Sequence, residues 1–267
     1  MRKLSEEELK NILKDHQVWL RTNKKDGKRA DLNQVDLQYV DLSGANLRNA
    51  NLRCTNLAEA DLRGANLTKA NLEYANLCHA DLADANLCKA NLSSAYLSNT
   101  NLAEADLQGA NLNYSNLTNA NLTKAHLGYA NLVRTGLYEV NLTDANLYNA
   151  TLYRANLCKA NLTSAYLVDA NLSEADLSEA NLTDANLRCT KLCNTKLPKH
   201  IIQIGPIGSK KSYTVINLDD DIIYCERWKG NTEEFKNRID EVYPDDGEYR
   251  TQYLLVIKII ESLKNVK

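Results

Sequence analysis

Long apolar segments are missing from this chain of 267 residues, whose mean hydropathy is −0.46. No apolar run approaches the roughly 18 residues that a membrane-spanning helix needs. The first residues, Met1 to Glu8, turn acidic at once and lack the apolar core of a secretory signal peptide. We therefore expect a cytoplasmic protein that does not enter a membrane.

An excess of charge of one sign is missing as well. The net charge is −2 and the isoelectric point is near 6.1, so direct nucleic-acid binding is not expected. The chain has no glycine-rich phosphate-binding motif and no nucleophile elbow. The four histidines lie far apart without metal-ligand spacing: His16, His79, His126 and His200. We expect neither an enzyme nor a bound cofactor.

The seven cysteines form an odd-numbered set without the spacing of a disulfide framework. The adjacent Cys78 and His79 are the best case for a metal or redox cluster. The alternative is a set of reduced thiols on the surface of a protein in a reducing compartment. We favour that alternative, because most of the cysteines fall at variable positions of the repeat described next. No metal is expected.

Leucine occupies every fifth position from Leu32 to Leu197, 34 times without interruption, and Ala or a small or β-branched residue stands two positions before each leucine. In an α-helix a step of five residues turns the side chain by about 140°, so the leucines would not share a face. In a strand Ala45 and Leu47 share a face, but Ala50 comes three positions later and breaks the alternation. The chain must bend once per repeat, and stacked coils then bury a column of Leu and Ala.

The repeat unit reads Ala-(Asn/Asp)-Leu-x-x, as in Ala65-Asn66-Leu67-Thr68-Lys69. Over about residues 30–197 the chain closely resembles the pentapeptide-repeat family. The resemblance implies a mainly β fold, a right-handed quadrilateral β-helix with four repeats per coil, a number that the periodicity alone does not fix. The repeats then make about 8 coils and a rod about 40 Å long, at roughly 4.8 Å between stacked strands. We expect this β-helix over residues 30–198.

Residues 1–29 are expected to form a helical cap. Ser5 and Glu8 make a capping-box pattern at the start of a helix over residues 4–22. One face of this helix is apolar or aromatic: Leu9, Ile12, Leu13, His16, Trp19 and Leu20. The end of a solenoid exposes leucines and unpaired backbone groups and needs a cover. We therefore expect His16 to pack against the rod and not to act in catalysis.

Residues 199–267 are expected to form a small α+β domain after Pro198, which cannot donate a ladder hydrogen bond. Strands are predicted over 201–204, 212–216 and 222–225, and helices over about 232–241 and 248–263. On the last helix, Leu254, Ile257 and Ile260–Leu263 are expected to face inward, with Leu255, Val256 and Ile259 widening the apolar face.

The segments 208–211 and 224–235 resemble a small tail found on many bacterial pentapeptide-repeat proteins, for which no activity is implied. We expect the tail to cap the rod. The alternative is a docking or dimerisation module, so the protein is predicted to be a monomer or a tail-mediated homodimer.

With four repeats per coil, residues 20 apart stack on one side of the rod. The side that begins at Leu42, named the acidic side, carries seven acids against Arg63 and Lys124. These acids are the candidate interaction face: Asp41, Asp61, Asp81, Asp84, Glu104, Asp144 and Asp184. The same side carries a row of asparagines (Asn101 to Asn181) and a row of threonines (Thr123 to Thr183), which we expect to hydrogen-bond along the axis.

The first functional hypothesis is a non-enzymatic scaffold that presents a regular surface to a protein partner. The alternative follows from the resemblance, since some pentapeptide-repeat proteins mimic DNA and bind DNA gyrase; such a protein competes with DNA for a basic surface. The acidic side favours mimicry. The net charge of −5 over the repeats, the leucine at every repeat centre and the single phenylalanine, Phe235, argue against it.

Overall fold

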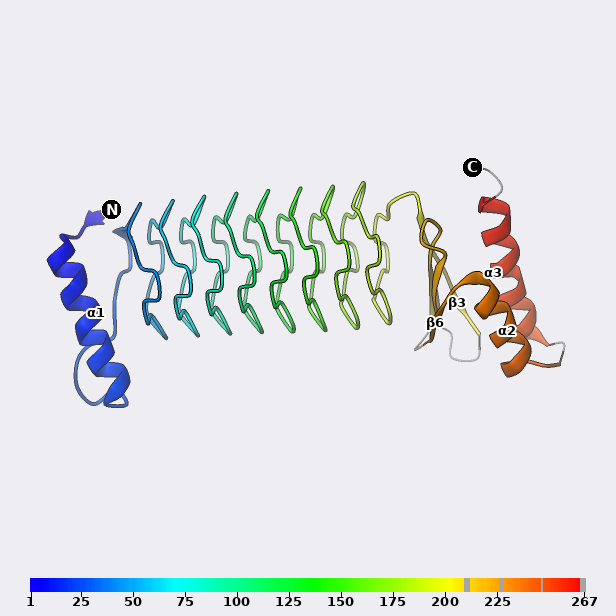
Figure 1. Cartoon of the computed structure of the whole chain (residues 1–267), viewed down its shortest axis with the longest axis horizontal. Coiled ribbons are helices and arrows are strands. Elements are labelled where there is room, and N and C mark those ends of the chain that lie inside the picture. Colours follow the sequence, from blue (N-terminus) through cyan, green and yellow to red (C-terminus); the bar gives the residue numbers. More distant parts are fainter. Residues whose placement is uncertain (209–211, 226–227, 246, 265–267) are drawn as a thin grey trace.

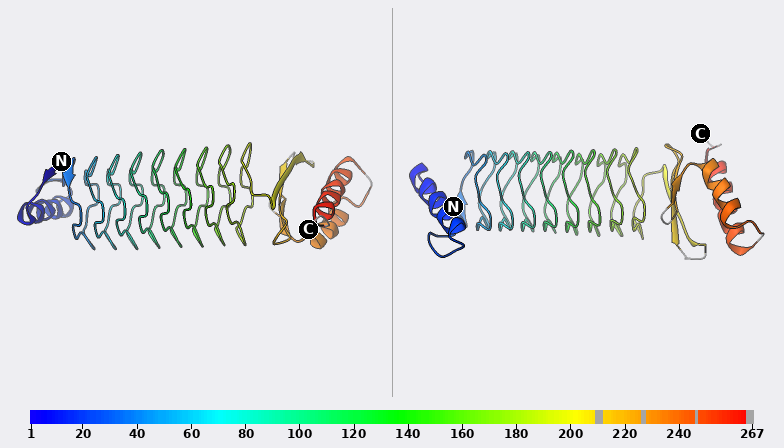
Figure 2. Two further views of the ribbon diagram at one scale, coloured as in Figure 1. Left: turned by 90° about the horizontal axis from the view of Figure 1, so that it is seen from above. Right: turned by 60° about the horizontal axis from the view of Figure 1, so that its bottom comes forward.

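The computed structural model of the chain, described for residues 1–208, 212–225, 228–245 and 247–264, is a rod with a helix at one end and a small α+β unit at the other (Figures 1 and 2). Along the rod, parallel bridges join residues 20 apart, from Asp31 with Asn51 to Asp176 with Lys196. Four pentapeptides therefore make one coil, as the resemblance implied.

Backbone hydrogen bonds join each repeat to both neighbouring coils. The Leu47 amide donates to the Asn66 carbonyl at 2.8 Å, and the Asn49 amide donates to Thr68 at 2.9 Å. In the other direction, the Asn51 amide donates to the Ala30 carbonyl at 2.9 Å. This ladder pairs the polar backbone groups that a stacked coil would otherwise leave buried without partners.

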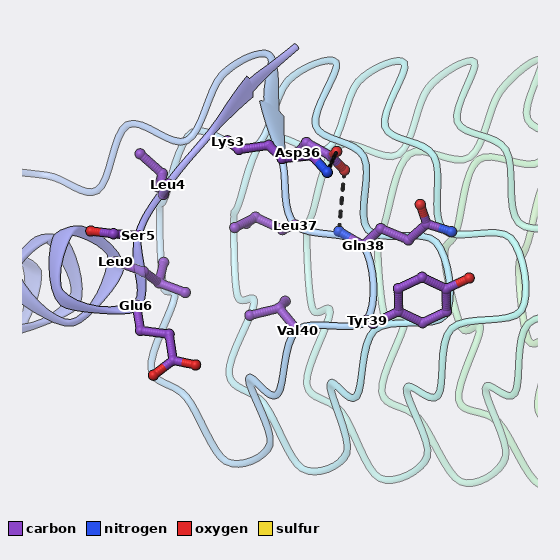
Figure 3. Close-up of a pocket in the computed structure, with 10 residues that line it drawn as sticks. All are labelled: Lys3, Leu4, Ser5, Glu6, Leu9, Asp36, Leu37, Gln38, Tyr39 and Val40. Carbon is purple, nitrogen blue, oxygen red and sulfur yellow. Dashed lines mark hydrogen bonds and ion pairs between the residues drawn. The ribbon is translucent and has the colours of Figure 1, made fainter.

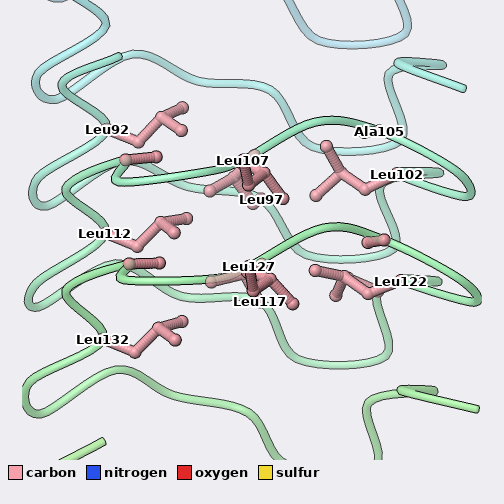
Figure 4. Close-up of a cluster of buried hydrophobic side chains, with 14 of the residues drawn as sticks. Leu92, Leu97, Leu102, Ala105, Leu107, Leu112, Leu117, Leu122, Leu127 and Leu132 are labelled. Carbon is pink, nitrogen blue, oxygen red and sulfur yellow. The ribbon is translucent and has the colours of Figure 1, made fainter. Parts of the chain in front are cut away.

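The interior is a continuous column of leucine and alanine. The repeat leucines from Leu42 to Leu192 are each at most 2% exposed, and Figure 4 shows Leu92, Leu112 and Leu132 stacked one above another. Threonine replaces alanine at a few inward positions, where its hydroxyl is satisfied. The Thr55 hydroxyl, for example, donates to the Leu32 carbonyl at 2.7 Å, so the polar group costs little on burial.

Each repeat turns through a residue in the left-handed conformation. All residues two positions after a repeat leucine, from Gln34 to Asn194, have φ between 54° and 64°. This region disfavours β-branched side chains. The sequence agrees, because these positions hold no Val, Ile, Thr or Pro, whereas the preceding position holds Thr123, Val133 and Val168. The five-residue spacing predicted a bend, and this exclusion marks the residue that makes it.

The N-terminal cap consists of helix α1 (Glu6–Arg21) and strand β1 (Arg2–Lys3). The predicted capping box is present: the Glu8 amide donates to the Ser5 hydroxyl at 3.2 Å, and the Ser5 amide donates to the Glu8 carboxylate at 2.8 Å. Strand β1 pairs in parallel with β2 (Val35–Asp36) on the first coil, a contact that the sequence did not predict. The apolar side chains of the cap that pack on the core are Leu4, Leu9, Ile12 and Leu13.

His16 joins the cap to the first coil. Its side chain is fully buried, its ring stacks on Trp19 at 5.5 Å, and its Nδ1 accepts a hydrogen bond from the Ala30 amide at 3.1 Å. Burial lowers the pKa of His16, with the Arg29 charge acting in the same direction and a contact with the Arg48 backbone opposing it. The expected packing role is thus accompanied by a hydrogen bond that only the neutral imidazole can make.

The C-terminal unit is an antiparallel sheet of β3 (Ile201–Ile207), β4 (Ser212–Asn217), β5 (Ile222–Cys225) and β6 (Trp228–Gly230), covered by α2 (Thr232–Val242) and α3 (Glu248–Lys264). Its two faces alternate along the strands. The cross-strand pair Val215 and Tyr224 packs with the rod core, and the Tyr224 hydroxyl donates to the Ala185 carbonyl at 2.5 Å. The next pair, Ile216 and Ile223, packs against the helices. The sheet therefore lies between the last coil and the two helices.

Parts of the predicted tail are corrected by the structure. Strand β3 continues beyond residue 204 through Ile207, and β6 was not predicted. Leu254 and Leu263 are 36% and 39% exposed, so their predicted inward placement is wrong. The inward face of α3 is Tyr253, Val256, Ile257 and Ile260, at the helical spacing of three and four. Residues 209–211 and 226–227 of the tail resemblance lie outside the described residues, and the domain boundaries at residues 29 and 198 stay predictions.

The turn geometry gives a first testable prediction at two adjacent serines. Ser94 is the left-handed residue, with φ 56°, and Ser93 precedes it. We expect Ser94→Thr to lower the free energy of unfolding by roughly 1 kcal/mol or more. Ser93→Thr is the matched control and should be nearly neutral, since threonine already occupies the equivalent position in Thr123. Equal effects in urea melts of the two variants would contradict the turn assignment.

A second prediction concerns the pH dependence of the cap. The pKa of His16 in the folded protein lies below the ordinary value of 6.5. Below pH 6.5 the imidazole therefore takes up a proton when the cap unfolds, and acid favours the unfolded state. We expect the stability of the cap to be complete above pH 6.5 and to fall as the pH drops below it. Trp19 fluorescence in a Trp228→Phe background during urea unfolding measures this. The same pH dependence in His16→Gln would show that another group is responsible.

Candidate protein-interaction surface

The seven acids of the candidate face lie in two rows on the acidic side. Asp41, Asp61 and Asp81 each precede a leucine and form consecutive parallel bridges along the rod. The other four each follow a leucine by two positions and have positive φ, which places them at the corner of the coil: Asp84, Glu104, Asp144 and Asp184. The structure thus places the predicted residues on one side, with a central row and a corner row.

Arg63 ties the central row together. Its guanidinium donates to both oxygens of Asp61, at 2.9 and 2.5 Å, and lies 3.7 Å from Asp81. Hydrogen bonds from Arg63 lower the pKa of Asp61 to about 2. The Ser43 hydroxyl and amide donate to Asp41 and lower the pKa of that carboxyl. The lowered pKa values keep Asp41 and Asp61 ionised at neutral pH, and one arginine offsets part of the negative charge of the row.

The corner row is less engaged. Lys124 lies 3.6 Å from Glu104, whose side chain is 58% exposed. Within the described residues, Asp84, Asp144 and Asp184 take part in no ion pair. Asp184 lies where the tail meets the rod, and its backbone amide donates to the Asp220 carboxylate at 3.0 Å. Among the described residues, the corner thus presents carboxylates without ion-pair partners at Asp84, Asp144 and Asp184, from the third coil to the C-terminal end of the rod.

The acidic side has the largest net charge of the four sides of the rod. The repeats contain 17 acids and 12 bases, a net charge of −5. The acidic side alone has seven acids and two bases, also −5, and the other three sides together have ten of each. Of those three sides, the one that begins at Leu37 has five acids and two bases, a net charge of −3. The sides that begin at Leu32 (three acids, four bases) and Leu47 (two acids, four bases) are positive, so the acidic side is the most negative of the four.

Beyond Asn101, the acidic side is held by a network of asparagine and threonine. The Thr123 hydroxyl donates to the side-chain oxygen Oδ1 of Asn121 at 2.7 Å and accepts from the side-chain Nδ2 of Asn141, one coil further on, at 3.0 Å. The same linkage recurs at Thr143 and Thr163. Hydrogen bonding along the axis is present as predicted. The links between these coils join an asparagine to a threonine, and not two identical side chains.

Pairs of a cation and a tyrosine, which the sequence did not reveal, occupy the sides that begin at Leu32 and Leu37. Arginines lie over three rings at 5.1–5.7 Å: Arg53 on Tyr74, Arg134 on Tyr114 and Arg154 on Tyr153. Lys159 lies over Tyr138 at 5.4 Å. The partners in most of these pairs come from neighbouring coils, so they are found only when the sequence is read in steps of about 20.

A pocket of about 300 Å³ lies where the cap meets the first coil (Figure 3). Lys3, Ser5 and Asp36 contribute polar groups, while Leu4 and Leu9 form apolar walls. These leucines also pack on the rod core, so the pocket is a seam of the cap. We assign no ligand to it.

In residues 1–208, 212–225, 228–245 and 247–264, no three side chains of His, Cys, Asp or Glu form a group that would hold a metal ion. Cys78 and His79 are thus not part of such a group. Across the described parts of the chain, no helix has the length and apolar character needed to cross a bilayer.

The comparison with protein families identifies the repeat region. The sequence model for pentapeptide repeats (8 copies) matches residues 30–68, 65–102, 100–135, 137–173 and 160–197. These matches cover well over half of the chain, which therefore belongs to the pentapeptide-repeat family. Members of this family fold as right-handed quadrilateral β-helices, in agreement with the coil described above.

Solved structures of the same family are similar to this chain. HetL from the cyanobacterium Nostoc sp. strain PCC 7120, a protein involved in heterocyst differentiation regulation, is 32% identical over 73% of this chain and 93% of HetL, with a TM-score of 0.37. QnrB1, a plasmid-mediated fluoroquinolone resistance protein, is 21% identical over 64% of this chain and 91% of its own, with a TM-score of 0.50. The second likeness shows the fold alone. Among curated proteins, none matches this sequence.

The Arg63 network gives a third prediction. We expect the Asp61 carboxyl to titrate with a pKa of about 2 in the intact protein. Arg63→Ala should raise this pKa toward the ordinary aspartate value, because the guanidinium hydrogen bonds are lost. Titration of the side-chain carboxyl carbon by NMR measures the shift, with Asp41 as the internal control, since Ser43 accounts for most of its lowered pKa. An unchanged Asp61 pKa in Arg63→Ala would contradict the network.

Proposed function

We propose that this protein is a non-enzymatic scaffold that presents the acidic side of its β-helix to the basic surface of a protein partner. One observation carries the proposal: the acidic side, with a net charge of −5, is the most negative of the four sides of the rod. Exposed charge of one sign speeds and orients the encounter with a surface of the opposite sign. Ladder hydrogen bonds hold the side chains of this rod of about eight coils at fixed spacing, so little ordering is needed on binding.

The alternative function, a mimic of DNA that binds gyrase or another DNA-binding protein, uses the same acidic side. Duplex DNA carries about one negative charge per 1.7 Å, or roughly 24 charges over 40 Å. The acidic side carries a net charge of −5 over a rod of about 40 Å. This charge density is several times lower than that of DNA, which favours the scaffold over the mimic.

Location and oligomeric state belong to the same proposal. The cysteines of the repeats lie at outward positions with half-buried or exposed side chains, as expected of thiols in the reducing cytoplasm. Helix α3 leaves Leu254, Leu255 and Leu263 exposed, and a tail-mediated homodimer would form through these residues. The alternative is a monomer whose tail only caps the rod.

The fourth prediction tests the proposed function by charge reversal. The variant Asp61→Lys, Asp81→Lys, Glu104→Lys should lose a protein partner that the wild type retains from bacterial lysate, and retention by the wild type should weaken with salt. The control Glu59→Lys, Glu139→Lys, Glu179→Lys makes the same change of charge on the side that begins at Leu37, and it should keep the partner. Circular dichroism verifies that both variants fold.

Two outcomes of this experiment would contradict the proposal. If both variants lose the partner equally, net charge and not the acidic side determines binding. If the acidic-side variant keeps the partner, recognition lies elsewhere in the chain. Inhibition of gyrase supercoiling by the wild type, absent in the acidic-side variant, would favour the mimic.

A further inference from the structure

Three tyrosines form a cluster on the side that begins at Leu47, next to the acidic side. Tyr129, Tyr148 and Tyr166 come from three successive coils. The rings of Tyr129 and Tyr148 meet edge to face at 5.5 Å, and those of Tyr148 and Tyr166 are tilted at 6.3 Å. Tyr129 is 54% exposed and Tyr166 is 39% exposed. The cluster therefore offers aromatic surface to a partner, and Tyr148 lies at its centre.

The residues that directly follow the repeat leucines of this side surround Tyr148. Gly128, one coil before Tyr148, has no side chain, and Val168, one coil after it, is only 2% exposed although its position points outward. Neighbouring side chains therefore cover Val168, and Gly128 is buried as well. Tyrosine and arginine dominate the energetic centres of protein interfaces, where aromatic side chains bury a large area.

The cluster differs from the other paired tyrosines of the rod in having no cation. Tyr74, Tyr114, Tyr138 and Tyr153 each have an arginine or lysine of this chain over the ring. Among the described residues, no cation lies over the rings of the cluster. Cations of this chain thus cover tyrosine rings on two sides of the rod, whereas the rings of the cluster can accept a cation from another molecule.

Carboxylates lie on both corners of this side. Asp144 is on the corner shared with the acidic side, and Asp169 is on the opposite corner, one coil further on. Both are exposed, and within the described residues neither takes part in an ion pair. Tyr129 and Asp169 raise the pKa of Tyr148, and of these two groups Asp169 carries a negative charge at neutral pH. A cation over these rings would have a carboxylate on either flank.

We propose that the tyrosine cluster binds arginine side chains of a basic protein partner, with the rings stacking on the guanidinium and Asp144 and Asp169 pairing with its charge. Arginine fits better than lysine because its planar guanidinium stacks on an aromatic face and donates to carboxylates at its edge. The inference rests on the proposed function, since it names the group by which a basic partner is held beside the acidic side.

The fifth prediction uses a defined probe, a Gly/Ser peptide bearing three arginines, titrated into the full chain by calorimetry. The same peptide with three lysines should bind more weakly. Tyr129→Ala should weaken arginine-peptide binding by roughly fivefold or more, and so should the double variant Asp144→Asn, Asp169→Asn. Tyr96→Ala is the matched control, because Tyr96 is 55% exposed on another side, and it should bind like the wild type. Tyr148→Phe keeps the ring and should retain binding.

Wild-type affinity in Tyr129→Ala, or equal affinity for the arginine and lysine peptides, would overturn the assignment of the cluster. The partner experiment separates this failure from that of the proposed function. The acidic-side variant could lose the partner while Tyr129→Ala retains it. That result would support the proposed scaffold function and contradict the role of the cluster. Arginine-specific binding to the cluster could also occur while the acidic-side variant still retains the partner. That result would support the cluster and contradict the role of the acidic side.

Discussion

The backbone hydrogen bonds between residues about 20 apart are the constraint on which the rest of this molecule depends. They require every coil to have the same length and every corner to turn at the same residue, and that residue is held in a left-handed conformation. Leucine and alanine are then directed inward, and the positions between them outward, at intervals of roughly 4.8 Å. Each surface feature, from the acids near Arg63 to the tyrosine cluster, is a consequence of this single register.

The two ends of the rod lack a neighbouring coil with which to form these hydrogen bonds. A stacked coil presents unpaired backbone groups and leucines at each terminus. At the N-terminal end the Arg2–Lys3 strand and His16 supply hydrogen-bonding partners, whereas at the C-terminal end Tyr224 and Asp220 do so. Both caps combine an apolar face with a few polar groups aimed at the open backbone edge. A covered end of this kind offers no open backbone edge for pairing with another rod.

Much of the fold could be predicted because its signals are local or strictly periodic. The leucines every five residues predicted the coil, and Ser5 with Glu8 predicted the start of α1. The missed features depend on contacts between distant segments. Strand β1 is two residues long and exists only by pairing with the first coil, and the burial of Tyr253 in place of Leu254 depends on how α3 lies on the sheet. The acidic side could be read from the sequence once 20 residues per coil were assumed, but the positions of Arg63 and of the tyrosine cations required the structure.

The even spacing of the repeats has a consequence for how such a protein can change in length. Loss or gain of one pentapeptide would preserve the leucine column, since every repeat offers the same inward residues. It would also turn every later residue by one quarter of the circumference, so that the acids beyond that point would move to a different side. Only changes in multiples of four repeats keep the surface in phase. The core of this rod tolerates any whole number of repeats, and its surface pattern counts them in fours.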